Sequence, residues 1–170
     1  FKDWRLLIVD DFTCASNVTD YLDYLNKKYK NIIIIKNSSR LGLTQSLINL
    51  YPLINSEYIA RIDSGDTWDP EKLELQIKYL ENNSDIGLIG SQVRYLSTKE
   101  DIVGQSSFPS EYNDIERECC NKIGLFAHSS IVFRKENNIF YRSLYFYSQD
   151  LDLYLQFISS KIKIVNYRKV

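Results

Sequence analysis

The sequence has 170 residues, with 44% hydrophobic and 25% charged side chains, which is an ordinary composition for one folded domain. Its formal net charge is −1, so the chain lacks the broad basic field that attracts nucleic acid. Its apolar runs have the length of strands, which excludes a spanning helix within this sequence. Its three cysteines show the spacing of neither a zinc site nor a disulfide framework.

The first half of the sequence alternates between short apolar runs and amphipathic segments. Because they are apolar and rich in β-branched residues, four runs are predicted as strands: 5–10, 32–35, 58–62, and 86–89 with a continuation through 92–96. Three helices are predicted between them: 17–30 with Ser16 or Asn17 as N-cap, one from Leu43 to Pro52, and one that starts at the Asp69–Pro70 pair. The alternation indicates an α/β fold with a mostly parallel sheet and helices on both faces.

The second half of the sequence is less regular. Residues 97–125 are polar, with one helix predicted at 112–120. Periodicity then predicts a strand, a helix and a final strand at 130–133, 149–158 and 162–167. No internal repeat or linker divides the chain, so a single domain over residues 1–170 is predicted.

Acidic residues follow two of the predicted strands. Asp10 and Asp11 end the first strand, and Asp63 and Asp66 follow the third. Ligands of parallel α/β sheets bind beyond the carboxyl ends of the strands, so both groups are expected at one rim. Carboxylates there suit Mg²⁺ or Mn²⁺, which prefer oxygen ligands, whereas solvated turn residues are the alternative interpretation.

Five segments resemble family 2 glycosyltransferases, which have the GT-A fold and transfer sugars from nucleotide sugars with inversion. In chain order they are "FKDWRLLIVDDFT", "NSSRLGLTQSLIN", "SEYIARIDSGDTWDPEKLELQIKYLE", "FAHSSIVFRKE" and "SQDLDLYLQF". Each motif alone is weak, but the ordered set covers most of the chain. The resemblance implies a Rossmann-like GT-A domain with a nucleotide-sugar-binding half at 1–96 and an acceptor-side half at 97–170. It also implies that the family's first strand and helix precede this sequence.

The resemblance implies a nucleotide-sugar site made by four residues: Asp11, Arg40, Asp63 and His128. Asp11 would accept hydrogen bonds from the base or ribose. Arg40 would contact the base or the diphosphate, or else is an exposed loop arginine. His128, the only histidine, would face the diphosphate or the acceptor, with a structural role as the alternative.

The resemblance also implies a metal site and a catalytic base. Asp63 and Asp66 match the family's acidic motif and would hold Mg²⁺ or Mn²⁺. The family pattern is Asp-x-Asp-Asp, and here Gly65 stands at the middle acid, which leaves the ligand assignment open. Asp150 matches the general base, and Gln149 replaces the glutamate that often precedes it. Helix capping is the alternative role of Asp150.

The function implied by the resemblance is inverting transfer from a nucleoside-diphosphate sugar to a saccharide, a lipid-linked acceptor or another hydroxyl, in bacterial surface polysaccharide synthesis. The expected location is cytoplasmic, including the inner face of the cell membrane. Weak or absent activity is expected of the 170-residue piece alone, because the strand that would precede it contributes to the nucleotide pocket. Two alternatives are a non-catalytic nucleotide-sugar-binding module and, with less support, a phosphoacceptor receiver domain, which would need a Lys-Pro pair after its fifth strand.

Overall fold

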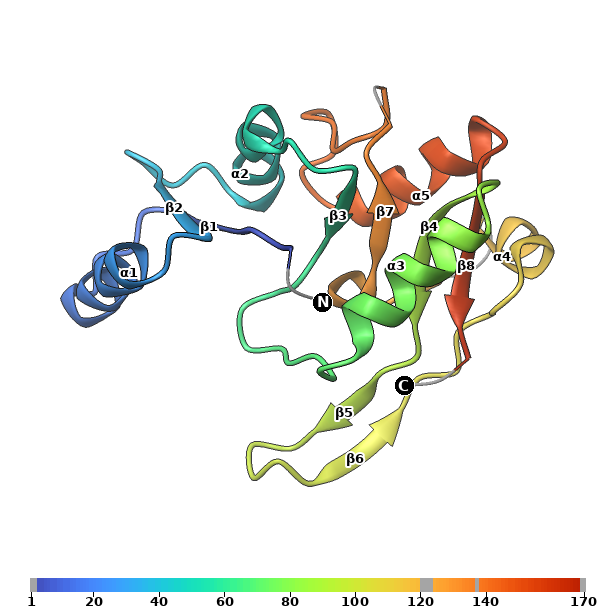
Figure 1. The fold of residues 1–170 in the computed structure, drawn as a ribbon, viewed down its shortest axis with the longest axis horizontal. Helices are drawn as coiled ribbons and strands as arrows, with labels where there is room; N and C mark the ends of the chain where they lie inside the picture. The colour runs from blue at the N-terminus through green and yellow to red at the C-terminus, as the bar shows by residue number, and fades with distance from the viewer. Residues whose placement is uncertain (1–2, 120–123, 137, 169–170) are drawn as a thin grey trace. The chain divides into compact units, whose positions relative to one another are not determined.

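The computed structural model describes residues 3–119, 124–136 and 138–168. The chain divides into two compact units, of which unit 1 comprises Phe1–Asn55 and Phe140–Asp152 and unit 2 comprises Ser56–Ile139 and Leu153–Val170. Helices and strands alternate along the chain, so the predicted α/β class is confirmed (Figure 1). No helix among these described residues is long and apolar enough to cross a membrane.

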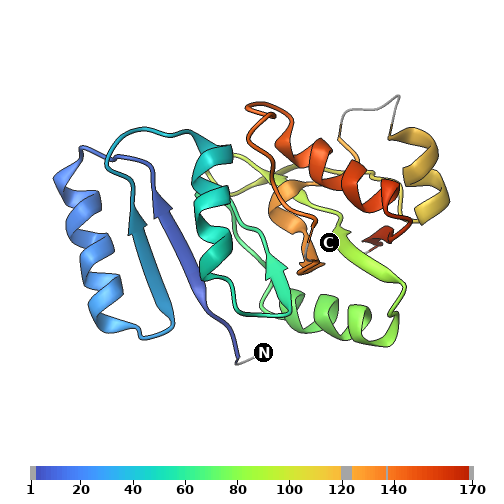
Figure 2. The same ribbon diagram turned by 90° about the horizontal axis from the view of Figure 1, so that it is seen from above.

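Unit 1 is built on one pair of parallel strands. Its elements are β1 (Leu6–Asp10), α1 (Ser16–Lys28), β2 (Ile32–Lys36), α2 (Leu43–Leu50) and the 3₁₀ helix η1 (Tyr51–Leu53). The strands pair in register from Leu6 opposite Ile32 to Asp10 opposite Lys36. α1 packs against β2 and α2 packs against β1 (Figures 1 and 2).

Both helices of unit 1 begin at residues that lack a side-chain cap. The predicted cap at Ser16 or Asn17 is wrong, because Ala15 holds the N-cap position of α1. Gly42 precedes α2 with φ 83° and ψ 165°, a backbone conformation that is essentially restricted to glycine. Pro52 lies in η1, so the predicted end of α2 near this proline is confirmed.

Unit 2 contains a four-stranded sheet with the order β3-β7-β4-β8. Its strands are β3 (Tyr58–Ala60), β4 (Ile86–Ser91), β7 (Val132–Arg134) and β8 (Lys163–Tyr167). β4 and β8 are parallel, and β7 is antiparallel to both β3 and β4. The carboxyl ends of β3, β4 and β8 therefore lie at the same edge of this sheet, where ligand sites are expected in α/β folds.

Helices cover both faces of the four-stranded sheet. α3 (Lys72–Asn82) lies on one face, and α4 (Tyr112–Glu118) and α5 (Gln149–Ser159) lie on the other (Figure 2). On the α3 face, Leu80 of the helix belongs to a hydrophobic cluster with Ile89 of β4 and Val132 of β7, and all three side chains are fully buried. On the opposite face the rings of Phe133 and Phe157 meet edge to face, with centroids 6.0 Å apart. These layers confirm the predicted coverage of both faces.

Three predicted boundaries in unit 2 differ from the structure. Residues 92–96 do not continue β4; instead β5 (Arg94–Leu96) forms a separate antiparallel hairpin with β6 (Ile102–Gln105). α3 begins at Lys72, because Asp69 accepts the amides of Glu71 and Lys72 in a turn before the helix. α4 ends at Glu118, and Cys120, where the predicted helix ended, lies outside the described residues.

Candidate functional site

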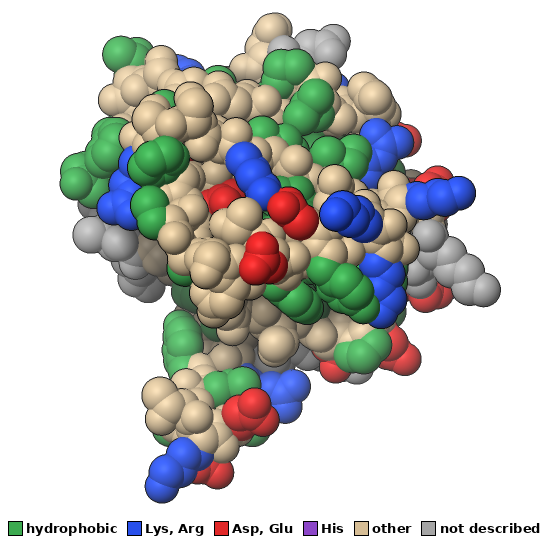
Figure 3. Space-filling view, turned by 90° about the vertical axis from the view of Figure 1, so that its left-hand side faces the viewer, with side chains coloured by type: hydrophobic (Ala, Val, Ile, Leu, Met, Phe, Trp, Pro, Cys, Tyr) green, Lys and Arg blue, Asp and Glu red, His purple; other side chains and the backbone are tan. Residues whose placement is uncertain are grey.

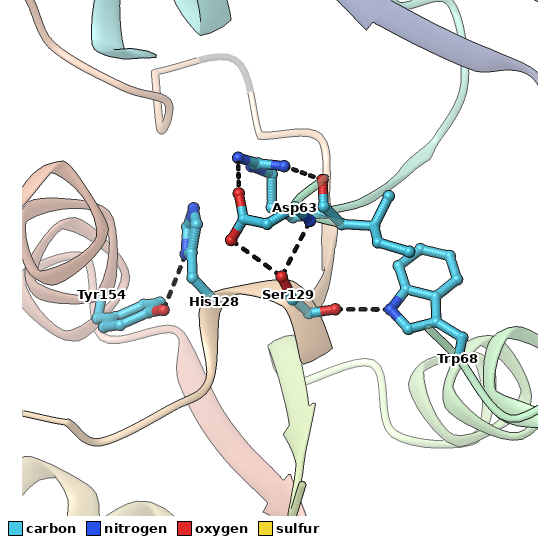
Figure 4. A network of polar contacts seen from close by, with 7 residues as sticks. Asp63, Trp68, His128, Ser129 and Tyr154 are labelled. Carbon is cyan, nitrogen blue, oxygen red and sulfur yellow. Dashed lines mark hydrogen bonds and ion pairs between the residues drawn. The ribbon is translucent and has the colours of Figure 1, made fainter. Parts of the chain in front are cut away.

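The carboxylate of Asp63, just beyond β3, is held from two sides (Figure 4). Arg61 forms an ion pair with Oδ1, and the hydroxyl of Ser129 donates to Oδ2 at 2.9 Å. The backbone amide of Asp63 donates to Ser129 Oγ, also at 2.9 Å. Ser129 lies in the 3₁₀ helix η2 (His128–Ser130), directly before β7, and β7 pairs with β3. The pairing of β7 with β3 thus places Ser129 beside Asp63, which lies 66 positions earlier in the chain.

A tryptophan and a lysine support the same loop. Trp68 Nε1 donates to the carbonyl oxygen of Ser129 at 2.7 Å. Lys72 Nζ lies 4.0 Å from the centroid of the Trp68 ring, and this buried nitrogen has no hydrogen-bond partner within the described part of the chain. Burial lowers the pKa of Lys72 from 10.5 to about 7, although the ring face of Trp68 attracts the charged form.

His128 lies beside this network in unit 2. Its Nδ1 is 3.0 Å from the hydroxyl of Tyr154, which is buried at 2% exposure in α5. Figure 4 shows the second ring nitrogen of His128 pointing away from Tyr154, on the side of Asp63. The contact with Tyr154 fixes the ring position, so His128 has a structural role here in addition to the ligand role predicted for it.

The loop between Asp63 and Asp66 offers few ligands to a metal ion. Asp66 is exposed, and its amide donates to the Asp63 carbonyl oxygen at 3.2 Å, closing a turn over Gly65 at φ 98°. No group of three or more His, Cys, Asp or Glu residues that could hold a metal ion occurs among the described residues. The oxygen donors of Asp63 and Asp66 have the right chemistry for Mg²⁺ or Mn²⁺, but phosphate oxygens or water would have to complete the shell.

Asp11, in unit 1, organises the loop that leads into α2. Its Oδ1 accepts from Asn37 Nδ2 at 2.8 Å and from the Leu41 amide at 2.7 Å, and its Oδ2 accepts from the Gly42 amide at 2.8 Å. These donors, the Leu41 amide first, lower the pKa of Asp11 below 3.8. A carboxylate can accept about four hydrogen bonds, so capacity remains for one ligand donor.

The other two predicted residues of unit 1 are Arg40 and Asp150. Arg40 is exposed in the loop before Leu41, whose amide binds Asp11. Asp150 lies in the first turn of α5, where its Oδ1 accepts the amide of Leu151 at 2.9 Å. Asp152, two residues further on, is buried and pairs with Arg142 through two hydrogen bonds, so it has a structural role.

The predicted residues thus form two groups, one in each unit. Unit 1 holds Asp11, Arg40 and Asp150, and unit 2 holds Asp63, Asp66 and His128. Sequence reasoning missed the partners that fix these groups: Asn37, Arg61, Trp68 as a donor, Lys72 and Ser129. Asn37, Trp68 and Ser129 contact residues far apart in the chain, so no short-range spacing signals them. Arg61 and Lys72 lie close in sequence to Asp63 and Trp68, but their residue types are equally common on exposed surfaces.

Comparison with known proteins gives one family and several relatives. The model of "Glycosyl transferase family 2" matches residues 1–154. The chain is 30% identical over 165 residues to an uncharacterized glycosyltransferase of Methanocaldococcus jannaschii, covering 95% of this chain and 57% of that protein. It is 28% identical over 169 residues to the UDP-Glc:alpha-D-GlcNAc-diphosphoundecaprenol beta-1,3-glucosyltransferase WfaP of Escherichia coli, covering 98% and 63%.

A solved structure of CMP:2-keto-3-deoxy-manno-octonic acid synthetase complexed with CTP has a similar fold, with a TM-score of 0.50 and 11% identity. The match covers 96% of this chain and 71% of that one. The chain spans 57% and 63% of the lengths of the two curated relatives above.

Proposed function

This chain belongs to glycosyl transferase family 2, and on that premise we propose that the complete protein transfers a sugar from a nucleoside-diphosphate sugar to an acceptor hydroxyl with inversion. The proposed acceptor is a saccharide, including a lipid-linked sugar at the inner face of the cell membrane, and the proposed setting is surface polysaccharide synthesis. Similarity to the Escherichia coli glucosyltransferase, whose name specifies a lipid-linked acceptor, supports this choice.

One observation carries the proposal: the Asp63 carboxylate is fixed at the carboxyl end of β3 by Arg61 and Ser129. A carboxylate held this way loses little conformational freedom when a ligand arrives. Asp66, in the same turn, is exposed and adds a second carboxylate. Both acids lie within the segment matched by the family.

The predicted residues of each unit have their own proposed roles. Asp11 keeps acceptor capacity for a ribose hydroxyl or a base N–H after its bonds to Leu41 and Gly42. The guanidinium of Arg40 suits two phosphate oxygens. Asp66, together with Asp63, would hold Mg²⁺ or Mn²⁺, which neutralises charge on the departing diphosphate when bound.

Asp150 is the proposed general base. The acceptor oxygen would bond to the anomeric carbon while the bond from that carbon to the diphosphate breaks, and Asp150 would take the hydroxyl proton. Among the described residues, only the Leu151 amide donates to the Asp150 carboxylate. An oxygen of this carboxylate is therefore left to accept the proton.

The test compares two acid-to-amide variants of the complete protein. Asp150→Asn should bind donor as the unaltered protein does, measured by calorimetry with UDP-, GDP- and dTDP-sugars with and without Mn²⁺. Its turnover should fall by about 10²–10⁴-fold. Asp20→Asn, on the exposed surface of α1, is the matched control and should change neither quantity. Unchanged turnover in Asp150→Asn would refute the assignment of the base.

A second candidate function is nucleotide-sugar binding without transfer. It is favoured by Arg61, which already neutralises Asp63, and by Gly65 in place of a third acid. This candidate expects donor binding and no turnover in the unaltered complete protein. Turnover that depends on Asp150 would exclude it.

A further inference from the structure

Lys72, the first residue of α3, ends in a buried amine. Lysine and arginine side chains normally project into water, as the blue side chains in Figure 3 do. The side chain of Lys72 is instead half-buried, and its Nζ is buried with no hydrogen-bond partner in the described part of the chain. This nitrogen lies over the ring of Trp68, 4.0 Å from the ring centroid. Because a buried donor without an acceptor is costly, the position calls for an explanation.

A second unpartnered polar atom lies one turn further along α3. Gln76 is only 2% exposed, and its Oε1 is buried with no donor among the residues that the structure describes. Residues four positions apart lie on the same face of a helix, so Lys72 and Gln76 share one side of α3. One side chain has an unused donor, and the other has an unused acceptor.

The side chains around the buried amine hold the η2 segment. Trp68 Nε1 donates to the carbonyl oxygen of Ser129 at 2.7 Å, and Gln76 Nε2 donates to the carbonyl oxygen of Ser130 at 3.0 Å. Trp68 and Gln76 are together called the η2 clamp. Ser129 accepts the amide of Asp63 and donates to its carboxylate, both at 2.9 Å (Figure 4). The clamp therefore supports the Asp63 carboxylate through Ser129.

Lys72 can change its charge beside this clamp near neutral pH. Burial lowers the pKa of Lys72 to about 7. The elements that pack most against α3 are β4, which carries no titratable residue, and β7. Arg134 of β7 binds the carbonyl oxygen of Leu80 near the other end of the helix, at 2.6 Å. The lysine therefore has no charged partner on these two strands.

The remaining charged groups near the start of α3 lie at the surface or in η2. The acids of the preceding loop and of the first helical turn are exposed, and none accepts a hydrogen bond from the Lys72 amine within the described residues. These acids are Asp66, Asp69, Glu71 and Glu74. Histidine changes charge between about pH 5 and 8, so His128 of η2 is a second titratable group beside the clamp.

We propose that Lys72 is a positioning residue whose protonation state controls how firmly the η2 clamp holds Ser129 and, through it, the Asp63 carboxylate. The neutral amine stays packed on Trp68. The charged amine has no acceptor in its buried position, so its flexible stem carries it toward water. Trp68 then loses a packing partner, and its hydrogen bond to Ser129 weakens.

The charge of Lys72 should also affect a ligand held by Asp63 and Asp66, and this consequence rests on the proposed function. At about pH 6, one unit below the pKa of Lys72, about one molecule in ten holds the neutral amine. If that form alone binds well, Mn²⁺ should bind about tenfold more weakly at pH 6 than at about pH 8.

The first measurement follows the indole N–H resonance of Trp68 in the complete protein, assigned by its loss in Trp68→Phe. Between about pH 6 and about pH 8 it should shift with a midpoint near pH 7. Lys72→Met, which has a neutral side chain of similar length, should lose this shift. Lys78→Met, on the exposed side of the same helix, is the control and should keep it. His128 is present in all three proteins, so its own titration cannot produce the difference.

The second measurement is calorimetry with Mn²⁺ on the complete protein at about pH 6 and about pH 8. The affinity of the unaltered protein should fall about tenfold more than that of Lys72→Met. Lys72→Arg, which stays charged, should bind weakly at both values.

The proposal is overturned if the Trp68 resonance has the same pH profile in the unaltered protein and in Lys72→Met. It is also overturned if both proteins bind Mn²⁺ and their affinities change equally with pH. If the resonance follows Lys72 but the complete protein binds neither Mn²⁺ nor a nucleotide sugar, the role of Lys72 is supported and the proposed function is refuted.

Discussion

Asp11 and Asp63 both follow strands, yet the two units hold these acids in opposite ways. In unit 1 the donors to Asp11 are neutral: two backbone amides and the side chain of Asn37. In unit 2 the donors to Asp63 are the Arg61 guanidinium and the Ser129 hydroxyl. Asp11 therefore keeps its full negative charge, whereas the charge of Asp63 is offset by a neighbour.

This difference separates the tasks of the two acids. A charged acceptor with neutral partners suits recognition of N–H and O–H donors on a ligand. An acid that already pairs with arginine contributes little net charge to a cation site, so Asp66 supplies most of the negative charge in that loop. The contrast leads to three predictions, given in decreasing order of expected effect.

The largest expected effect comes from neutralising each acid in turn. Asp63→Asn leaves Arg61, whose side chain is only 13% exposed, without its ion-pair partner. The free energy of unfolding should fall by about 2 kcal/mol, less than for a fully buried pair because the Asp63 side chain is 45% exposed. Asp11→Asn should lower the free energy of unfolding by about 1–2 kcal/mol, because the side-chain NH2 group of asparagine cannot accept the hydrogen bonds that a carboxylate oxygen accepts from the backbone amides. Urea denaturation of the complete protein measures both.

Salt separates the two mechanisms. In about 1 M NaCl the cost of Asp63→Asn should shrink, because ions screen the pair, while the cost of Asp11→Asn should persist. Equal salt dependence of the two variants would show that the acids are held by similar forces and would remove the contrast.

The second prediction concerns Lys72, whose buried Nζ lies over the ring of Trp68. Its pKa of about 7 is below the ordinary 10.5, so between these values the unfolded chain holds one more proton than the folded one. Stability should therefore rise with pH above about 7, by up to about 1.4 kcal/mol per pH unit. Below about pH 7 the lysine is charged in both states and adds no slope.

Lys72→Met should remove this slope, measured by urea denaturation between about pH 7 and about pH 8. Lys78→Met, on the exposed side of the same helix, is the control and should keep it. If Lys72→Met and Lys78→Met have the same pH profile, Lys72 is not buried in its neutral form.

The smallest expected effect comes from restoring an acid at Gly65. No atom lies within 4 Å of a Cβ added there, so Asp fits, but its φ of 98° should cost about 1 kcal/mol of stability. A third carboxylate should raise Mn²⁺ affinity about tenfold, measured by calorimetry on the complete protein. Gly65→Asn has the same shape without the charge. If it binds Mn²⁺ as tightly as Gly65→Asp, charge is not the limiting factor.

Local patterns predicted most of the fold. β1, β2, α1 and α5 were predicted to within about two residues, because each has clear apolar periodicity. The hairpin of β5 and β6 was missed, since Ile102 and Val103 are exposed and show no buried alternation. The N-cap of α1 was also predicted wrongly. Ser16 and Asn17 are preferred N-cap residue types, but Ala15 holds the position without a side-chain hydrogen bond.

For the site, the sequence predicted acids at strand ends but not what holds them. Asp11 and Asp63 follow β1 and β3 as expected. Ser129 reaches Asp63 only because β7 pairs with β3, and strand pairing of this range has no local signature. Lys72 was missed because lysine is rarely buried without a partner, so its type indicated a solvated position.

Two glycines with positive φ will respond differently to random mutation. Position 65 has open space and can accept several small polar residues at modest cost. Gly42 has a backbone conformation that is restricted to glycine, and a Cβ atom added there would lie 3.2 Å from Cε2 of the Phe146 ring. Every replacement is therefore opposed both by backbone strain and by this close contact. In a saturation library selected for folded protein, codon 42 should stay nearly invariant, whereas codon 65 should vary. A larger residue at position 42 would be accepted only together with a smaller residue at position 146.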